Sequence, residues 1–152
     1  MGQIKSGSIT PNTIVNGDVA AGANIESSKL QHNYIFTHDF GKHDAEGSIA
    51  AVKYTICIPQ SVVTITSVKA WLVDSGTSTD IDFDLLVNNA SILTSAINIV
   101  HGTGDQTAVT GSIATPTVTG GNAITLSIAT VTSSTGALGP RMEVSYNSYV
   151  SY

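Results

Sequence analysis

Three carboxylates at alternate positions, Asp80, Asp82 and Asp84, form the strongest candidate for chemistry in the sequence. Clustered carboxylate oxygens are ligands that calcium accepts. The helix-loop-helix calcium pattern fails, because its sixth position requires glycine and its twelfth glutamate, and this chain has Leu85 and Ser91 there. The alternation instead predicts like charges on the solvent face of one strand, where they deter pairing with another sheet. The alternative is a metal site, or ion pairs to another subunit or to Lys53, Lys69 or Arg141.

The histidines are a weaker candidate for metal binding or catalysis. His38-Asp39 and His43-Asp44 flank Gly41, whereas the other two histidines, His32 and His101, stand apart without a nearby cysteine or glutamate motif. Tetrahedral zinc usually requires two pairs of ligands. The spacing therefore predicts a polar loop between the first two strands. If that loop contacts a neighbouring subunit, histidine titration makes the contact sensitive to mild acid.

Cys57 is the only cysteine, so the chain forms no internal disulfide. Strand alternation places it on one face with Lys53 and Thr55, pointing away from the core. A catalytic thiolate requires an adjacent base and a positive environment, and the sequence indicates neither. The nucleophile-elbow, phosphate-loop, zinc-protease and dinucleotide motifs are also missing. We therefore expect no enzyme, no cofactor and no metal.

Exposed aromatic rings can bind sugars by stacking, so the aromatic residues provide a test for glycan recognition. Trp71 lies in an apolar run, which predicts a core position. Tyr146, Tyr149 and Tyr152, near the C-terminus, are better candidates for an exposed aromatic surface.

The composition indicates how these residues are supported. Ser and Thr make up about a quarter of the 152 residues, and charged residues only 11%, against about 25% in a typical domain. Ile and Val, at 16 and 14, far outnumber the 3 Glu, which favours sheets over helices. The length suits one domain with a sizeable core.

The charge distribution restricts the partners. The formal net charge is -5, and no basic run occurs anywhere in the chain. Binding to nucleic acid or to an anionic membrane normally leaves a basic patch, so we expect neither partner. The apolar stretches are strand-sized, and no signal peptide is evident, which predicts synthesis in the cytosol.

From residue 34 to 152 the sequence predicts an antiparallel β-sandwich, jelly-roll-like, with about eight strands. The dry face is clearest where Ile81, Phe83 and Leu85 alternate with the three carboxylates. Glycines between the runs, such as Gly102, Gly104, Gly120, Gly121 and Gly136, suit turns or positive φ. The expected strands are Tyr34–Phe40, Ser48–Ile58, Ile65–Val73, Ile81–Val87, Ser91–Val100, Ala108–Ala114, Ala123–Thr132 and Met142–Val150.

Residues 1–33 have a different pattern, with single apolar residues about five apart on a polar chain: Ile4, Ile9, Ile14, Val19, Ile25 and Leu30. Neither a helix nor a strand places this spacing on one buried face. We therefore expect an extended arm of up to about 100 Å that is ordered by contact with another protein or with symmetry-related arms. A disordered tail is the alternative.

Several segments resemble virion proteins of tailed bacteriophages. The segment GDVAAGANIESSKL, residues 17–30, resembles arms of such proteins. The segments VKAWLVDSGT (68–77), IDFDLLVNNASIL (81–93) and STGALG (134–139) are similar to β-sandwich decoration and fibre-like proteins of phage capsids. Related sequences often have Asn-Gly in the middle turn, whereas this chain has Asn88-Asn89-Ala90, which implies a wider turn.

The resemblance implies a capsid decoration (cement) protein, located on the outer surface of the virion. Its expected partners are the major capsid protein, through the arm, and itself, in a homotrimer. The alternative is a fibre or receptor-binding module that recognises host surface glycans.

Overall fold

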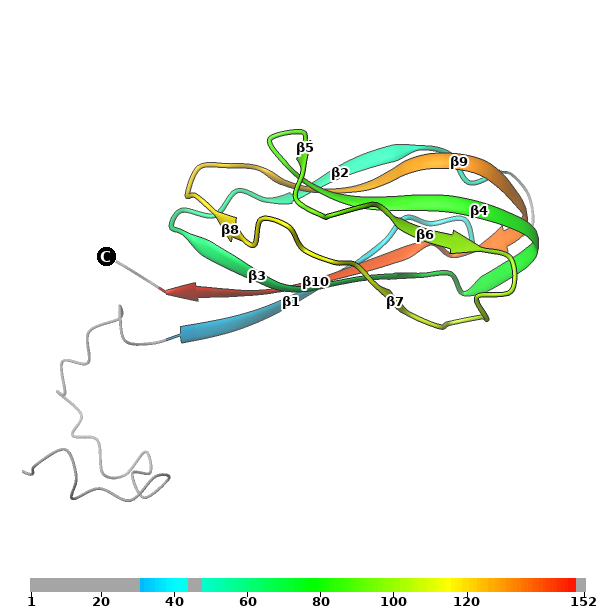
Figure 1. The fold of residues 1–152 in the computed structure, drawn as a ribbon, viewed down its shortest axis with the longest axis horizontal. Coiled ribbons are helices and arrows are strands. Elements are labelled where there is room, and N and C mark those ends of the chain that lie inside the picture. The colour runs from blue at the N-terminus through cyan, green and yellow to red at the C-terminus, as the bar shows by residue number, and fades with distance from the viewer. Residues whose placement is uncertain (1–30, 44–47, 150–152) are drawn as a thin grey trace, which may run out of the picture.

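The computed structural model describes residues 31–43 and 48–149, and every regular element in this part of the chain is a β-strand (Figure 1). The ten strands are β1 (Gln31–Asp39), β2 (Val52–Cys57), β3 (Val63–Trp71), β4 (Asp74–Val87), β5 (Ala90–Ser91), β6 (Ile97–Val100), β7 (Val109–Thr110), β8 (Thr117–Val118), β9 (Ile124–Leu138) and β10 (Arg141–Tyr149).

The strands form two antiparallel sheets packed face to face. The first sheet has the order β1-β10-β3-β7, with β8 also paired to β3. The second has the order β2-β9-β4-β5, with β6 also paired to β4. Because β5 and β6 share one flank of β4, and β7 and β8 one flank of β3, the sandwich has eight strand positions. This order is that of a jelly roll, so the predicted fold is confirmed.

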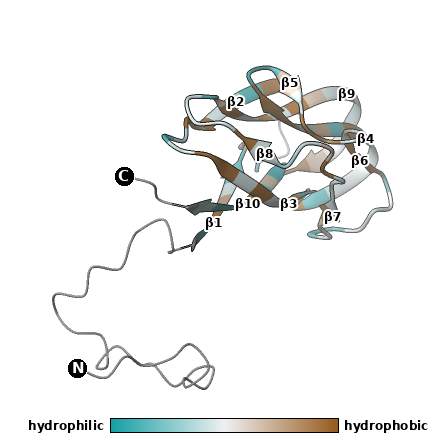
Figure 2. Cartoon of the chain, turned by 60° about the vertical axis from the view of Figure 1, so that its left-hand side comes forward, coloured by the Kyte–Doolittle hydropathy of each residue, from teal (hydrophilic) through white to brown (hydrophobic). Residues whose placement is uncertain are grey.

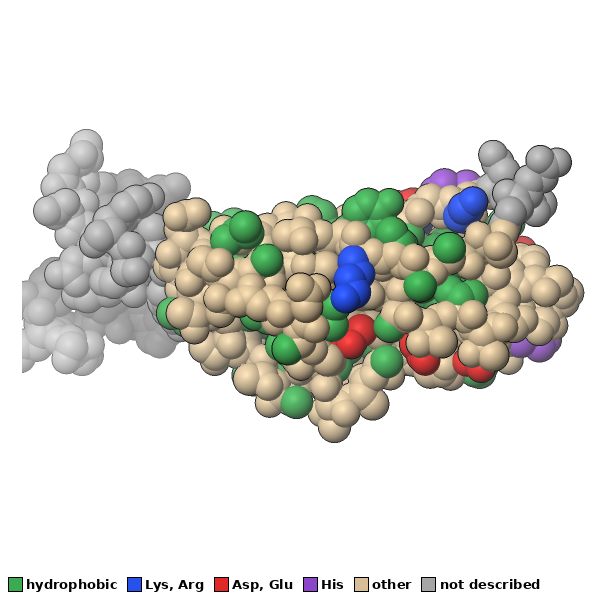
Figure 3. Space-filling view, turned by 90° about the horizontal axis from the view of Figure 1, so that it is seen from above, with side chains coloured by type: hydrophobic (Ala, Val, Ile, Leu, Met, Phe, Trp, Pro, Cys, Tyr) green, Lys and Arg blue, Asp and Glu red, His purple; other side chains and the backbone are tan. Residues whose placement is uncertain are grey.

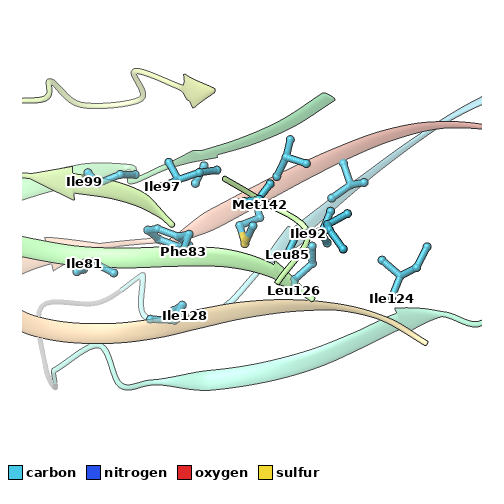
Figure 4. Packing of buried hydrophobic residues seen from close by; sticks show 14 of the residues in the cluster. Ile81, Phe83, Leu85, Ile92, Ile97, Ile99, Ile124, Leu126, Ile128 and Met142 are labelled. Carbon is cyan, nitrogen blue, oxygen red and sulfur yellow. The ribbon is translucent and has the colours of Figure 1, made fainter. Parts of the chain in front are cut away.

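The core lies between the sheets, and Figure 2 shows hydrophobic positions along the strands of both. Ile81, Phe83 and Leu85 are fully buried, as the alternation predicts. Leu126 and Ile128 of the neighbouring β9 are buried beside them, and Met142 and Val144 come from the opposite sheet (Figure 4). Full burial of a large apolar side chain contributes about 1.5–3 kcal/mol, so this cluster dominates the stability of the sandwich.

The long ribbon of β4 and β9 was only partly predicted. Its pairing runs from Asp74↔Leu138 to Val87↔Ile124, longer at one end than the expected strands. The added part contains Gly76 and Gly136, both with positive φ, and the register shifts between Ser75 and Ser78. Such irregularities bend strands. Figure 1 shows the ribbon curving round one end of the sandwich, from one layer toward the other.

Three expected strands are interrupted or shortened by loops, and of the range Ala108–Ala114 only β7, Val109–Thr110, is a strand. Within the range Ser91–Val100, only Ser91 and Ile97–Val100 pair with β4. The buried residues between these short pairings include Ile92 and Leu93, and Leu93 forms an isolated bridge to Ile113. A strand was also expected from Ser48, but β2 begins at Val52. The apolar residues here are thus buried in the core without being part of a continuous hydrogen-bonded strand. The hydrophobic pattern of the sequence does not distinguish a buried strand from a buried loop.

The turn at Asn88-Asn89 is tight, so the expectation of a wider turn is wrong. Val87 pairs with Ala90, which leaves only two residues in the turn. Both asparagines have positive φ, 49° and 67°, as a two-residue hairpin turn of the mirror-image type requires. Asparagine is the residue after glycine that best tolerates this conformation, so Asn-Asn replaces Asn-Gly without lengthening the loop.

Candidate interaction surface

The six apolar residues of the arm, Ile4, Ile9, Ile14, Val19, Ile25 and Leu30, lie outside the described residues. The described chain starts at Gln31, which is also the first residue of β1. The arm therefore joins the sandwich at an edge strand of the first sheet.

The acidic strand face contains carboxylates that have neutral hydrogen-bond partners. The Nδ2 amide of Asn98 donates to Oδ1 of both Asp80 and Asp82, at 2.8 Å each. Asp84 Oδ1 accepts from the Ser91 hydroxyl at 2.7 Å. Within the described residues no three His, Cys, Asp or Glu side chains are grouped to hold a metal ion. Figure 3 shows acidic side chains from the middle of this face toward one end, with a basic side chain beside the group in the middle.

Two of the three expected basic partners of these carboxylates pair elsewhere, whereas Lys53 lines one hollow together with Asp84. Lys69 Nζ lies 3.3 Å from Glu143 Oε1, and Arg141 lies 3.0 Å from Asp39. His43 Nε2 also contacts Asp39, at 3.0 Å. His38 and Asp39 are the last two residues of β1, so of the two histidine-aspartate pairs only His43 lies in the described part of the expected loop, and Asp44 lies outside the described residues.

The electrostatics of Asp39 follow from these contacts. Burial acts to raise the pKa of its carboxyl, but the Gly41 amide, the Arg141 guanidinium and His43 outweigh burial and hold the pKa below its usual value. The small ion network fixes the end of β1 against the start of β10.

Cys57 points inward, so the prediction that it faces away from the core is wrong. The register of β2 against β9 shifts between Thr55 and Cys57, which places Cys57 opposite Ile124. One extra residue in a strand reverses the face of every residue after it. Burial raises the pKa of the Cys57 thiol, and a hydrogen bond from the Tyr146 hydroxyl opposes that rise.

The candidate sugar-binding aromatics are arranged differently from the prediction. Trp71 is half-buried at the end of β3 and lies outside the core cluster, so its predicted core position is wrong. Tyr146 is half-buried rather than exposed, and its ring stacks on that of Tyr34 at 5.2 Å. Tyr152 and the side chain of Tyr149 lie outside the described part of the chain.

An exposed apolar surface involves β1 and was not predicted from the sequence. Tyr34, Ile35 and Phe36 have exposed fractions of 43%, 71% and 36%, and Tyr54 of the facing strand β2 has 42%. We call these four residues the β1 edge surface. The signal was present in the sequence, because three consecutive large apolar residues in a strand place apolar groups on both of its faces.

Beneath this surface, rings from both sheets are in contact. The ring centroid of His38 lies 4.4 Å from that of Tyr54 and 4.7 Å from that of Phe40. The ring centroid of Phe40 lies 6.1 Å from that of the core residue Phe83. Such ring pairs add about 0.5–1.5 kcal/mol beyond the area they bury. The cluster joins the edges of the two sheets at its His38 end.

The hollows of the described surface contain little that suggests catalysis. One hollow, of about 650 Å³, lies between residues 48–51 and 131–136, and is open to solvent. The described residues that line it offer hydroxyl, backbone and aliphatic groups, without a charged or aromatic side chain. No helix in the described chain is long and apolar enough to cross a membrane.

Comparison with known proteins adds a structural similarity. No protein-family model and no curated protein matches the sequence. Among solved structures, a chain of the "Cyanophage Pam1 capsid asymmetric unit" is similar to this chain, with a TM-score of 0.51 and 15% sequence identity. The similarity covers 77% of this chain and 84% of that chain. At this identity, the likeness establishes a shared fold.

Proposed function

We propose that this chain is a structural protein of a bacteriophage virion, which binds the outer surface of the capsid and stabilises the shell as a homotrimer. The observation that carries the proposal is the similarity of the jelly roll, over 77% of the chain, to a chain of a phage capsid asymmetric unit. The resemblance of residues 17–30 to phage virion arms supports it independently of the fold.

The two parts of the chain have separate roles in this proposal. The sandwich has its own core, and the arm precedes β1, whose first residue is Gln31. Each apolar residue of the arm contributes about 25 cal/mol per Å² buried on the major capsid protein. Three arms on one trimer bind with a high effective concentration, so weak single contacts add up to stable attachment. We assign no catalytic role, cofactor or metal to the chain.

Deletion of residues 1–30 separates these roles. We expect the truncated chain to unfold at nearly the temperature of the full chain, because β1 and the core remain intact. We expect its binding to capsids that lack this protein to fall to background in a co-sedimentation assay. Unchanged capsid binding by a folded truncated chain would show that the arm is not the anchor.

A receptor-binding module is the second candidate, and the exposed rings of Tyr34 and Tyr54 favour it, because such rings stack on sugars. The copy number in purified particles distinguishes the two functions. A cement protein is present in proportion to the capsid subunits, whereas a fibre or tail module is present in a few copies. Quantitative mass spectrometry of the particle measures this ratio, and retention on host glycans would support the receptor-binding function.

A further inference from the structure

The β1 edge surface is left uncovered by the described chain on both sides of the strand. The side chains of Tyr34 and Phe36 lie on the face shared with Tyr146 and Val144, their neighbours across the β1–β10 pairing, which is the inner face of the sheet. Ile35 lies on the opposite, outer face. Strand β1 pairs with β10 alone, so its other edge has no strand neighbour within the described residues. A partner on this side covers apolar groups and an open backbone edge together.

A buried polar atom under the same surface also lacks a partner. Nε2 of His38 is inaccessible to solvent and has no hydrogen-bond partner among the described residues. Buried polar atoms are nearly always paired, so this nitrogen marks a place where the described chain does not complete its own environment.

The charge distribution indicates what kind of partner fits. Five described carboxylates form no ion pair with a basic side chain. They lie on β4 or hydrogen-bond to its first residues: Asp74, Asp80, Asp82, Asp84 and Asp105. Strand β9 separates β4 from β2, and at the β1 edge the carboxylate of Asp39 is compensated by the guanidinium of Arg141. Because the chain has a net charge of -5, identical copies repel least where charges are compensated, which is on the β1 side.

The position of the arm completes the argument. The 30 residues that precede the described chain join it at Gln31, three residues before Tyr34. We propose that copies of this chain associate with each other through the β1 edge surface, formed by Tyr34, Ile35, Phe36 and Tyr54. This contact brings the starting points of all arms together, as simultaneous attachment to one capsid site requires. The number of copies, three, rests on the proposed function. The assignment of the contact to this surface does not depend on that function.

The test compares charge insertions at matched exposed positions of the full-length chain. Ile35→Asp and Tyr54→Asp place a carboxylate in the proposed contact, and Ile35→Leu preserves its apolar character. The controls are Val100→Asp and Val62→Asp, at residues with exposed fractions of 46% and 51% that lie outside the surface. Sedimentation equilibrium gives the mass of each variant, and thermal unfolding establishes that each one is folded.

We expect an oligomer for the wild-type chain, for Ile35→Leu and for both controls. We expect folded Ile35→Asp and Tyr54→Asp chains to associate about a hundredfold or more weakly, because each buries an unpaired charge. A monomeric wild-type chain at micromolar concentration, or folded variants that associate as tightly as the wild type, would overturn the inference. Failure of the wild-type oligomer to bind capsids would contradict the proposed function and leave this inference intact.

Discussion

At the scale of single residues, Cys57 shows how a local irregularity decides the environment of a side chain. The register shift after Thr55 turns the thiol toward Tyr146 rather than toward solvent. Partial burial disfavours the thiolate, so the pKa of Cys57 is raised, and the Tyr146 hydroxyl limits the rise by donating a hydrogen bond.

This arrangement predicts the pH dependence of alkylation. Cys57 is the only cysteine, so iodoacetamide labelling reports on it alone. We expect the midpoint of the rate profile to lie at higher pH in the folded chain than in urea. Tyr146→Phe removes the hydrogen bond and moves the midpoint higher still, whereas the control Tyr34→Phe leaves it nearly unchanged. A midpoint that falls in Tyr146→Phe would show that the tyrosine does not stabilise the thiolate.

Residue positions were predictable where a strand is regular. Alternation placed Ile81, Phe83 and Leu85 in the core correctly, since the period of a strand is two. The same rule was wrong for Cys57, because the bulge that changes the period has no marker in the sequence around Thr55. Trp71 was misplaced for a different reason: its apolar run predicts a core position, whereas alternation puts Ala70 and Leu72 in the core and leaves Trp71 half-buried on the other face of the strand.

At the scale of elements, the β4–β9 ribbon depends on glycines at its bend. Gly76 has a φ of +63°, and a Cβ built there would lie 2.4 Å from the carbonyl oxygen of Thr135. Gly102 has a φ of +91°, but a Cβ there would meet nothing within 4 Å. The two positions therefore separate backbone strain from steric overlap.

We predict that Gly76→Ala lowers the free energy of unfolding by about 2–4 kcal/mol, because it adds overlap with the backbone of β9 to the strain of a left-handed conformation. Gly102→Ala lowers it by about 1 kcal/mol, from strain alone. Urea unfolding of both variants measures the difference. An equal loss in the two variants would mean that the bend at Gly76 relaxes to admit a side chain.

The elements were predictable where hydrophobic alternation extends through a whole strand, as in the Ile81–Val87 part of β4. The extension of β4 and β9 beyond the expected ends was not, because residues 74–80 and 133–136 are mostly small and polar and have no alternation to read. Those residues pair because the ribbon continues across the end of the sandwich, so tertiary context and not local strand propensity determines their structure.

At the scale of the whole molecule, the sandwich and the arm have different sequence patterns, alternating in the sandwich and with apolar residues about five apart in the arm. The sandwich buries its alternating apolar residues against itself, which is why its fold was predictable from the chain alone. In the proposals above, the β1 edge surface and the arm contact partners, and a single sequence describes only one side of such a contact.

The proposed function predicts that the protein raises the temperature at which capsids release their DNA. A ligand that binds only the intact shell stabilises it by mass action, by about 2.7 kcal/mol per site at a hundredfold excess over the dissociation constant. Stabilisation must therefore follow occupancy. Ile9→Asp, Ile14→Asp and Ile25→Asp each place a charge where an apolar pocket of the coat protein is expected, so each lowers occupancy and release temperature.

Thr10→Asp and Asn12→Asp provide matched controls, because they add the same charge between the apolar positions of the arm. Both are expected to retain the occupancy and release temperature of the wild type. The measurement is DNA release on heating, followed by dye fluorescence, on particles with and without each variant. A release temperature that does not depend on the protein at full occupancy would refute cementing, and the receptor-binding function would then be the better explanation of the fold and its exposed rings.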